Sequence, residues 1–364
     1  MKDYKEFLAK AKYRMRGHYN ETIGTGIDQM KQFDQTILPD TYGTGAVIED
    51  FQAMISKDFG MEQAVFFPSG TMAQQIALKI WCDEMHTKKV AYHPLSHLEI
   101  HEKDGLKVLH KIETVLLGEV NRLFTLKDMQ EPGVLNRVSC VLFELPQREI
   151  GGQLPSWEEL VEMTSFCHKN GIYTHLDGAR LLEALPFYNK TAQEVCRIFD
   201  SVYISFYKSL GGVTGAMLMG NKEFMEKSKI WKRRYGGDLY HLYPYILSSR
   251  SCYLSRKEKM NEYWSGARIY AELLNTLPGV KTIPEVPVCN MFHVHFDWKV
   301  TEIEEALSKV IEKYDLALFG GVMPLDEGRT RTEIWVGDGF SQVPEMLMEE
   351  AVEEFGSFMK GSTT

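Results

Sequence analysis

The stretch that decides the fold is His175-Leu-Asp177-Gly-Ala-Arg180, together with Ser205-Phe-Tyr-Lys208-Ser-Leu-Gly-Gly further along the chain. A short apolar run leads into each stretch and predicts a buried strand, over 171–176 for the first and over 201–206 for the second. An aspartate and a lysine are therefore expected at the ends of two strands that follow one another in the chain.

An acid and a lysine so placed are what pyridoxal 5'-phosphate (PLP) chemistry requires. The lysine amine binds the cofactor aldehyde covalently, and the carboxylate keeps the pyridine nitrogen protonated so that the ring can accept electrons. Lys208 interrupts an aromatic and apolar run, where a lysine is costly unless it is paired or covalently used. The alternatives are a strand-end lysine that reaches solvent and, for Asp177, a simple helix cap. The combination favours a PLP enzyme.

The composition excludes several classes of protein. The 364 residues are 44% apolar and carry a net charge of −9, which argues against a nucleic-acid partner. No apolar stretch approaches the roughly 20 residues that span a bilayer, and the first residues lack the apolar segment of a secretory signal. The six cysteines are scattered without CxxC spacing, which favours buried, reduced thiols. We expect a cytoplasmic protein with no nucleic-acid or membrane partner.

Strands and helices alternate over the first two thirds of the chain. Further strands are predicted over 64–67, 90–92, 138–145 and 216–219, and a helix is predicted over 72–81. A second helix is predicted over 156–171, because Ser156 and Glu159 form a capping box that marks a helix start. This alternation predicts an α/β fold with a largely parallel sheet covered by helices on both faces. Ligands of such sheets bind at the carboxyl ends of the strands, where Asp177 and Lys208 fall.

Three segments are predicted: an N-terminal arm over 1–45, a large PLP-binding domain over 46–250 and a small domain over 251–364. In the last segment the pattern changes to that of an α+β domain. Helices are expected over 253–276, 301–314 and 343–359, and strands over 288–296 and 331–336.

Pro68-Ser69-Gly70-Thr71 lies between a predicted strand and a helix start, where free backbone N–H groups and the helix dipole favour an anion. Alone, this motif would more often be a helix cap; beside the acid and the lysine it predicts the phosphate site. Ser205 is a second hydroxyl that could reach the phosphate. Arg180 suits bidentate recognition of a substrate carboxylate, or is a surface arginine.

His97 and His101 lie at helical spacing and would suggest a metal site if a third ligand accompanied them. The chain has no HExxH pattern and no clear third ligand. No metal is predicted, and His97 alone reads as an ordinary core or surface histidine.

Taken together, these segments resemble the L-threonine aldolase and aromatic amino acid β-eliminating lyase family, which has the aspartate-aminotransferase-like fold (PLP fold type I). The resemblance is good from about Asp40 to Gly220 and looser beyond. Its motifs are Asp40-Thr-Tyr42-Gly43, Phe67-Pro-Ser-Gly-Thr-Met-Ala, Ser96-His97 with Glu102, Phe143-Glu144 leading to Gly151-Gly152, Asp177-Gly-Ala-Arg-Leu, and Lys208 with its glycines.

The resemblance implies a role for each matching position. Lys208 would hold the cofactor, Asp177 would face the pyridine nitrogen, and His97 would stack on the ring near the substrate β-hydroxyl. Gly70 and Thr71 would bind the phosphate. Arg180 and Arg331 would take the substrate carboxylate, and Tyr42 would reach the site of a neighbouring subunit in a homodimer or homotetramer.

The resemblance also implies the reaction, which is cleavage of L-threonine, L-allo-threonine or a related β-hydroxy-α-amino acid to glycine and an aldehyde. His97 or a bound water is the candidate base for the β-hydroxyl proton. PLP-dependent β-elimination, transamination and a catalytically silent PLP-fold binding protein are the alternatives.

The chain departs from the family pattern at several positions. It has Glu144-Leu-Pro-Gln147-Arg148-Glu149 where Glu-Asn-Thr-His-Asn is common, Tyr207 before the lysine in place of serine, and Tyr240 where an arginine is common. These positions concern the substrate and phosphate regions, so they leave the substrate side chain and its stereochemistry open.

Overall fold

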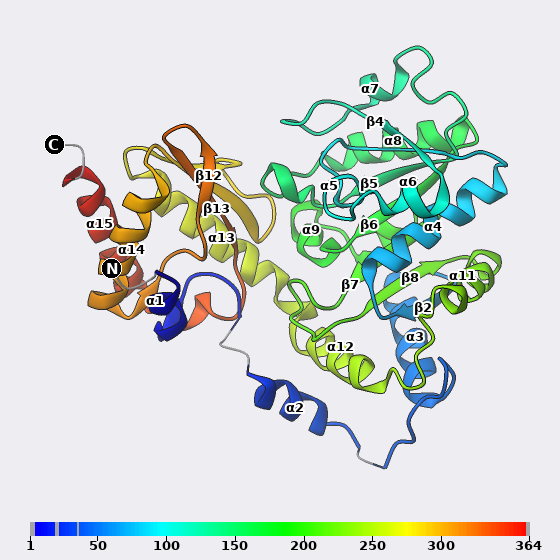
Figure 1. Cartoon of the computed structure of the whole chain (residues 1–364), viewed down its shortest axis with the longest axis horizontal. Coiled ribbons are helices and arrows are strands. Elements are labelled where there is room, and N and C mark those ends of the chain that lie inside the picture. The colour runs from blue at the N-terminus through cyan, green and yellow to red at the C-terminus, as the bar shows by residue number, and fades with distance from the viewer. Residues whose placement is uncertain (1–3, 19–21, 35, 362–364) are drawn as a thin grey trace. The chain divides into compact units, whose positions relative to one another are not determined.

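The computed structural model describes residues 4–18, 22–34 and 36–361 and shows two compact units (Figure 1). One unit holds Thr22–Glu149 and Leu154–Glu258. The other holds Met1–Glu21, Ile150–Gln153 and Lys259–Thr364. The grouping differs from the predicted segments because the predicted arm is shared between the two units. The predicted domain boundaries at residues 45 and 250 stay a prediction.

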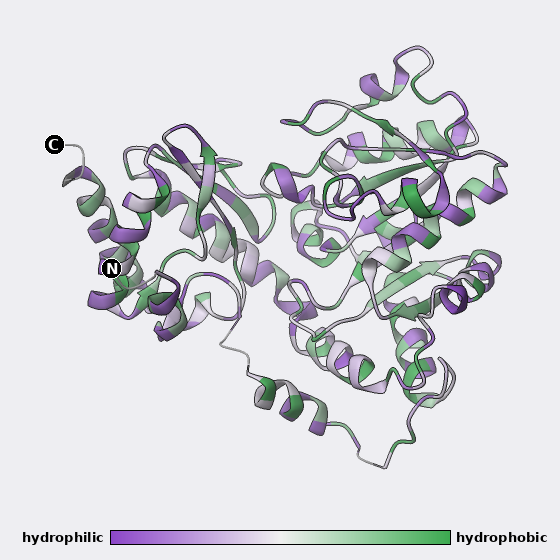
Figure 2. Cartoon of the chain, viewed as in Figure 1, coloured by the Kyte–Doolittle hydropathy of each residue, from purple (hydrophilic) through white to green (hydrophobic). Residues whose placement is uncertain are grey.

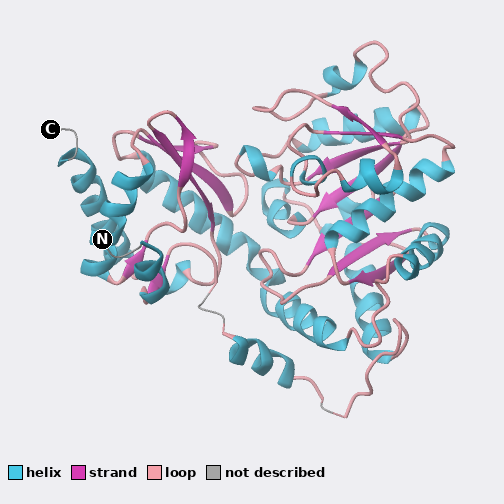
Figure 3. Cartoon of the chain, in the orientation of Figure 1, coloured by secondary structure: helices cyan, strands magenta, loops and turns pink. Residues whose placement is uncertain are grey.

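A seven-stranded mixed sheet is the centre of the first unit (Figure 3). Four of its strand pairings are parallel, whereas β8 runs antiparallel to both of its neighbours. The order across the sheet is β2 (Gln63–Phe67), β8 (Ala216–Gly220), β7 (Ser201–Ser205), β6 (Tyr173–Gly178), β5 (Cys140–Glu144), β3 (Lys89–Tyr92) and β4 (Glu113–Leu116). The predicted strands are confirmed. The direction of β8 and the existence of β4 were not predicted.

The apolar sequence of the strands explains why the sheet is buried. Every residue of β7 and β8 is buried, and Figure 2 colours β2 and β8 as largely hydrophobic. Helix α4 (Gly70–Glu84) packs across the sheet, with Ala73, Ile76, Ala77 and Ile80 inside the core. Strands β5, β6 and β7 are parallel to one another, so their carboxyl ends lie at the same edge of the sheet.

Among the remaining helices of this unit, α8 (Trp157–Lys169) is the one whose start was predicted from its cap residues. Ser156 and Glu159 form the predicted capping box at the start of α8. The helices are α2 (Ile23–Lys31), α3 (Ala46–Phe59), α5 (His97–Ile100), α6 (Gly105–His110), α7 (Leu126–Gln130), α8 (Trp157–Lys169), α9 (Leu181–Tyr188), α10 (Ala192–Cys196), α11 (Lys222–Arg234) and α12 (Tyr243–Arg256).

The second unit is built on an antiparallel sheet in the order β12 (Met323–Asp326), β13 (Arg329–Trp335), β10 (Met291–Phe296) and β9 (Val280–Ile283). Its helices are α1 (Tyr4–Lys10), α13 (Met260–Asn275), α14 (Val300–Tyr314) and α15 (Glu345–Gly361), and β1 (Tyr13–Arg14) pairs with β11 (Leu316–Ala317). The α+β prediction is confirmed. The single helix expected over 253–276 is wrong, because a 3-10 turn at Lys257–Lys259 separates α12 from α13.

All six cysteines are buried thiols, as their apolar surroundings predicted. Across 4–18, 22–34 and 36–361, no helix combines the length and the apolar character needed to cross a bilayer. Nor do the histidines, cysteines and carboxylates of those ranges form a group of three or more that could hold a metal ion.

Candidate active site

The chemistry-bearing side chains meet at the carboxyl ends of β5, β6 and β7. Glu144 and Asp177 are register partners at the ends of β5 and β6, and Lys208 follows β7. One pocket brings Lys208 and Asp177 together with other polar residues. Its lining is His97, His101, Glu144, Leu145, Pro146, Arg148, Glu149, Asp177, Ala179, Arg180 and Lys208.

Asp177 is held rigidly in the floor of this pocket. Its side chain is buried; Oδ2 accepts a hydrogen bond from Gln74 Nε2 at 2.7 Å, and Oδ1 accepts one from the backbone N–H of Ala179 at 3.1 Å. Gln74 comes from α4, so the helix that covers the sheet also orients the acid. Gln74 Oε1 is buried and has no hydrogen-bond partner among the described residues, which leaves an acceptor beside the acid.

Lys208 is partly buried, and its ammonium group forms no hydrogen bond or ion pair within the part of the chain that the structure describes. Burial lowers the pKa of Lys208, and the nearby Arg180 lowers it further, against the opposing effect of Asp177 and Glu144. A lysine with a lowered pKa has a larger neutral fraction, and the neutral amine is the form that attacks an aldehyde.

The start of α4 forms the second part of the site. Ser69 is the N-cap residue, but its side chain makes no capping hydrogen bond, so the first N–H groups of the helix keep their capacity to bind an anion. A Cβ on Gly70 would lie 2.0 Å from the hydroxyl of Tyr203, so glycine is required where the helix meets β7. The buried Oγ of Ser205 forms no hydrogen bond of normal geometry with the described residues.

His97 begins α5 and is oriented by two carboxyl groups. Its Nδ1 lies 3.2 Å from Glu102 Oε1, and its backbone N–H donates to Glu144 Oε2 at 3.3 Å. The Glu102 side chain is buried and also accepts a hydrogen bond from Gln75 Nε2 at 2.9 Å. The ring of His97 is therefore fixed at the pocket by a carboxylate that is itself anchored to α4.

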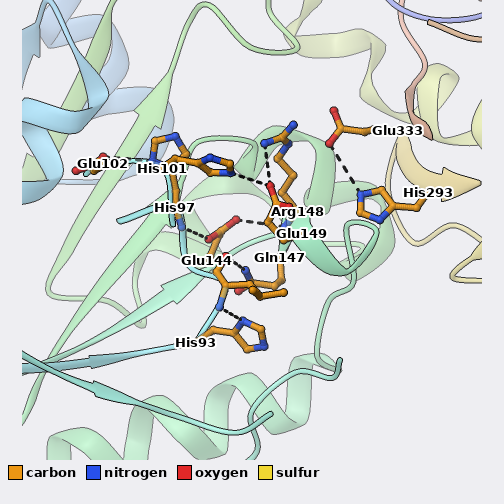
Figure 4. Close-up of polar contacts among 11 residues, drawn as sticks. His93, His97, His101, Glu102, Glu144, Gln147, Arg148, Glu149, His293 and Glu333 are labelled. Carbon is orange, nitrogen blue, oxygen red and sulfur yellow. Dashed lines mark hydrogen bonds and ion pairs between the residues drawn. The ribbon is translucent and has the colours of Figure 1, made fainter. Parts of the chain in front are cut away.

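Glu144 links the two loops that border the pocket (Figure 4). Its Oε2 accepts from the N–H of His97, and its Oε1 accepts from the N–H of Arg148 at 3.2 Å. Burial, followed by the charge of Asp177, raises the pKa of Glu144 to about 7. Burial and the charge of Asp177 favour the protonated form of Glu144 and outweigh the backbone N–H groups of Arg148 and His97, whose hydrogen bonds to the carboxyl group act in the opposite direction.

His101 and Glu149 form a second histidine–carboxylate pair beside the first. His101 Nε2 lies 2.9 Å from Glu149 Oε1, and Arg148 Nη1 donates to the same oxygen at 3.0 Å. The rings of His97 and His101 have centroids 5.1 Å apart. Figure 4 shows the two rings next to each other, with Glu102 beyond one and Glu149 beyond the other.

The three residues predicted to bind the substrate occupy different places in the structure. Arg180 is the N-cap residue of α9, is largely buried and lines the pocket, with Nε 4.0 Å from Glu183 Oε1. Tyr42 belongs to the same unit but does not line the pocket: its ring contacts Tyr240, and the guanidinium of Arg233 lies over it. Arg331 lies on β13 of the other unit, opposite His295 of β10. Its role stays a prediction.

The positions that depart from the family pattern also have structural roles. Gln147 Nε2 donates to the backbone oxygen of Leu95, which ties the loop before His97 to the loop after β5. Tyr207 is exposed beside Lys208, and Tyr240 is exposed and packs against Tyr42. The sequence alone assigns no role to Gln74, Glu144 or the His101–Glu149 pair. Glu144 does stand in one of the motifs of the family resemblance, and the four-residue spacing of His97 and His101 is the signal that draws attention to His101.

The described residues fit PLP. An amine without a polar partner lies beside a buried acid, as the covalent bond to the cofactor aldehyde and the pyridine nitrogen require. An uncapped helix start suits a phosphate, as does the buried Ser205 hydroxyl, which lies beside Tyr203 and has no hydrogen bond of normal geometry among the described residues. Together with the sheet, these features define a PLP-dependent enzyme of fold type I.

Comparison with known proteins agrees with this class. The model of the β-eliminating lyase family matches residues 23–295. A crystal structure from Listeria monocytogenes, provisionally assigned as an L-allo-threonine aldolase, is 48% identical, with 98% of each chain covered and a TM-score of 0.95. A structure from Exiguobacterium sp. 255-15, provisionally assigned as an aromatic amino acid β-eliminating lyase/threonine aldolase, is 46% identical, with 98% of this chain and 99% of that chain covered and a TM-score of 0.94.

Among curated proteins, the low specificity L-threonine aldolase of Saccharomyces cerevisiae is 26% identical over 321 residues, which cover 83% of this chain and 79% of that protein. The chain belongs to the β-eliminating lyase family. Enzymes of this family depend on PLP, and the predicted cofactor, enzyme class and aspartate-aminotransferase-like fold are confirmed.

Proposed function

We propose that this enzyme cleaves L-threonine, L-allo-threonine or a related β-hydroxy-α-amino acid to glycine and an aldehyde. The observation that carries the proposal is the single pocket in which Lys208, Asp177, His97 and Arg180 meet. The relatives support the reaction type, since the Listeria monocytogenes structure is provisionally assigned as an L-allo-threonine aldolase and the yeast protein is a low specificity L-threonine aldolase.

Lys208 would hold the cofactor through its amine, and Asp177, fixed by Gln74, would keep the pyridine nitrogen protonated. The start of α4, with Ser69, Gly70 and Thr71, and the hydroxyl of Ser205 would bind the phosphate. When bound, PLP supplies the electron sink that receives the pair of the broken Cα–Cβ bond. The protein supplies position and charge around it.

The remaining residues act on the substrate. Arg180 would bind the α-carboxylate, with Arg331 as a predicted second contact. His97 would cover the face of the cofactor ring, since its backbone is held by Glu144 and its ring by Glu102. A substrate held between the arginine and this histidine would have its Cα–Cβ bond fixed in one orientation, which selects the bond that breaks.

A homodimer or homotetramer is part of the proposal. Helix α2 has no buried residue, and Ile23 and Leu38 are 86% and 80% exposed. These exposed apolar side chains are the observation that we take as support for association in this region. Tyr42 would then serve a neighbouring site. Sedimentation at two or four times the chain mass supports this, and a monomer at micromolar concentration contradicts it. The cytoplasmic location stays a prediction.

The test is product analysis. The PLP-loaded enzyme is incubated separately with L-threonine, L-allo-threonine and phenylserine, and glycine is assayed with the matching aldehyde. Glycine and aldehyde in equal amounts support aldol cleavage. A keto acid with ammonia would indicate β-elimination, exchange of the amino group would indicate transamination, and bound cofactor without any reaction would indicate a binding protein.

A further inference from the structure

We propose that His101, oriented by Glu149, is the group that accepts the proton of the substrate β-hydroxyl. The inference rests on the proposed aldol cleavage and names the base that this reaction needs. The observation that supports it is that the His101–Glu149 pair lines the same pocket as Lys208 and Arg180.

The hydrogen bond of His101 determines which ring nitrogen can act. Nε2 lies 2.9 Å from a carboxylate oxygen of Glu149, and this contact places the ring proton on Nε2. The other nitrogen, Nδ1, then carries the free lone pair and has no polar partner within 4–18, 22–34 and 36–361. A carboxylate that holds the imidazole in one tautomer and stabilises the imidazolium is the arrangement expected of a general base.

Glu149 is itself held in place for this role. Arg148 Nη1 donates to the same Oε1 that contacts His101, and the Arg148 backbone N–H is bound by Glu144. The Glu149 side chain is also partly buried, with 16% of its surface exposed. The carboxylate cannot swing away from the imidazole without breaking contact with its arginine, so the pair is organised before substrate binds.

His97 is less suited to the same task. Its Nδ1 is bound to Glu102, and a ring that stacks on a cofactor turns its face, not a nitrogen lone pair, toward the bound molecule. His101 lies one helical turn further, with its ring 5.1 Å from that of His97. The two histidines therefore divide the work: His97 would cover the ring, and His101 would take the proton.

The proton and electron balance is simple. The O–H bond of the β-hydroxyl breaks and its proton moves to His101 Nδ1, while the oxygen forms a double bond to Cβ. The Cα–Cβ bond breaks, and the bound cofactor would supply the electron sink for its electron pair. The charged and titratable groups that share the pocket with His101 are His97, Glu144, Arg148, Glu149, Asp177, Arg180 and Lys208.

The experiment separates this step from the rest of the reaction. His101→Asn and His101→Gln are compared with the wild-type holoenzyme in two assays: cleavage of L-allo-threonine, and exchange of the glycine α-proton in D2O followed by NMR. Exchange requires the cofactor, Lys208 and Asp177 but involves no β-hydroxyl. We expect kcat/KM for cleavage to fall by about 100-fold or more, with exchange within a few-fold of wild type.

His86→Asn is the matched control, because His86 is an exposed histidine outside this pocket. Free imidazole should restore part of the cleavage rate of His101→Ala, since the ring is 40% exposed and its place can be reached from solvent. His86→Asn should keep both rates.

A third measurement does not depend on turnover. In protein labelled with 15N-histidine, the His101 ring should show the Nε2–H tautomer, and Glu149→Gln should alter its ring-nitrogen shifts. A wild-type enzyme that makes no glycine overturns the proposed function. If the wild type cleaves substrate, unchanged cleavage in both His101 variants, or equal loss of cleavage and exchange, overturns the role of His101, as does an Nδ1–H tautomer.

Discussion

Replacing Glu144 by Gln should change the pH dependence of stability, and the structure gives both the sign and the size. Glu144 has a pKa of about 7 in the folded protein against an ordinary value of 4.5, because burial and then the charge of Asp177 disfavour its ionised form. Below pH 4.5 the group is protonated in both the folded and the unfolded chain. Between pH 4.5 and 7 the unfolded chain releases the proton while the folded protein retains it, so the free energy of unfolding falls as the pH rises.

The size follows from the difference in pKa. At about 1.4 kcal/mol for each unit, the full difference corresponds to about 3 kcal/mol, lost between pH 4.5 and 7 and constant above. Glu144 keeps some solvent exposure through the pocket, so this figure is an upper bound. Glutamine cannot ionise, but it has one acceptor oxygen for the two N–H groups of His97 and Arg148, at a cost of about 1 kcal/mol at every pH.

The variant should therefore be less stable than wild type by about 1 kcal/mol below pH 4.5, and more stable by up to about 2 kcal/mol above pH 7. The assay is urea unfolding of cofactor-free protein at pH 4, 5.5, 7 and 8, with Glu162→Gln, which alters an exposed carboxyl on α8, as the control. A difference between the variant and wild type that does not change with pH, or that changes in the opposite direction, would refute the reasoning.

Three further predictions concern the cofactor site. Lys208→Ala should abolish both the visible absorption of bound cofactor and turnover, and a full absorption band in this variant would show that another amine holds the cofactor. Asp177→Asn should keep cofactor bound but lower kcat for cleavage by about 100-fold or more, because the ring nitrogen loses its charged partner. Stopped-flow or steady-state kinetics would reveal the fall in kcat, and an unchanged kcat would contradict the role of Asp177. Gly70→Ala should lower the free energy of unfolding by about 1–3 kcal/mol, because the new Cβ would meet the Tyr203 hydroxyl at 2.0 Å; equal Tm values would contradict the close approach.

The sheet could be predicted because its signals are local. Each buried strand is a short apolar run. The acid lies at the carboxyl end of β6 and the lysine lies three residues after β7, so the strand pattern alone placed both at one edge. The antiparallel direction of β8 could not be predicted, since an apolar strand of five residues reads the same in either direction. The split between α12 and α13 has no signal in the sequence, because the break at Lys257–Lys259 contains neither glycine nor proline.

Some residues of the candidate site could likewise be predicted from the sequence, and others could not. The phosphate site proposed at Ser69-Gly70-Thr71 can be suggested from the sequence, because an anion site at a helix start depends on neighbouring residues of the chain. Gln74 could not, since it reads as one more polar residue on α4 and gains its role only because Asp177, from β6, lies 2.7 Å away. Glu149 gives no local signal for the same reason: its partner His101 comes from a different loop.

The two groups of site residues are held in place by different kinds of contact. The residues that we propose to hold the cofactor are placed by backbone geometry, since a lysine at a strand end and a helix start can be positioned by the sheet alone. The residues that we propose to handle protons are placed by side-chain contacts between loops: Glu144 accepts hydrogen bonds from the N–H groups of His97 and Arg148, and Arg148 donates to the carboxylate that contacts His101. Substitutions in those loops can therefore change which substrate proton is removed without disturbing the sheet or the cofactor. The departures from the family pattern at Gln147 and Arg148 fall in one of these loops, so we expect them to set substrate preference and to leave cofactor binding unchanged.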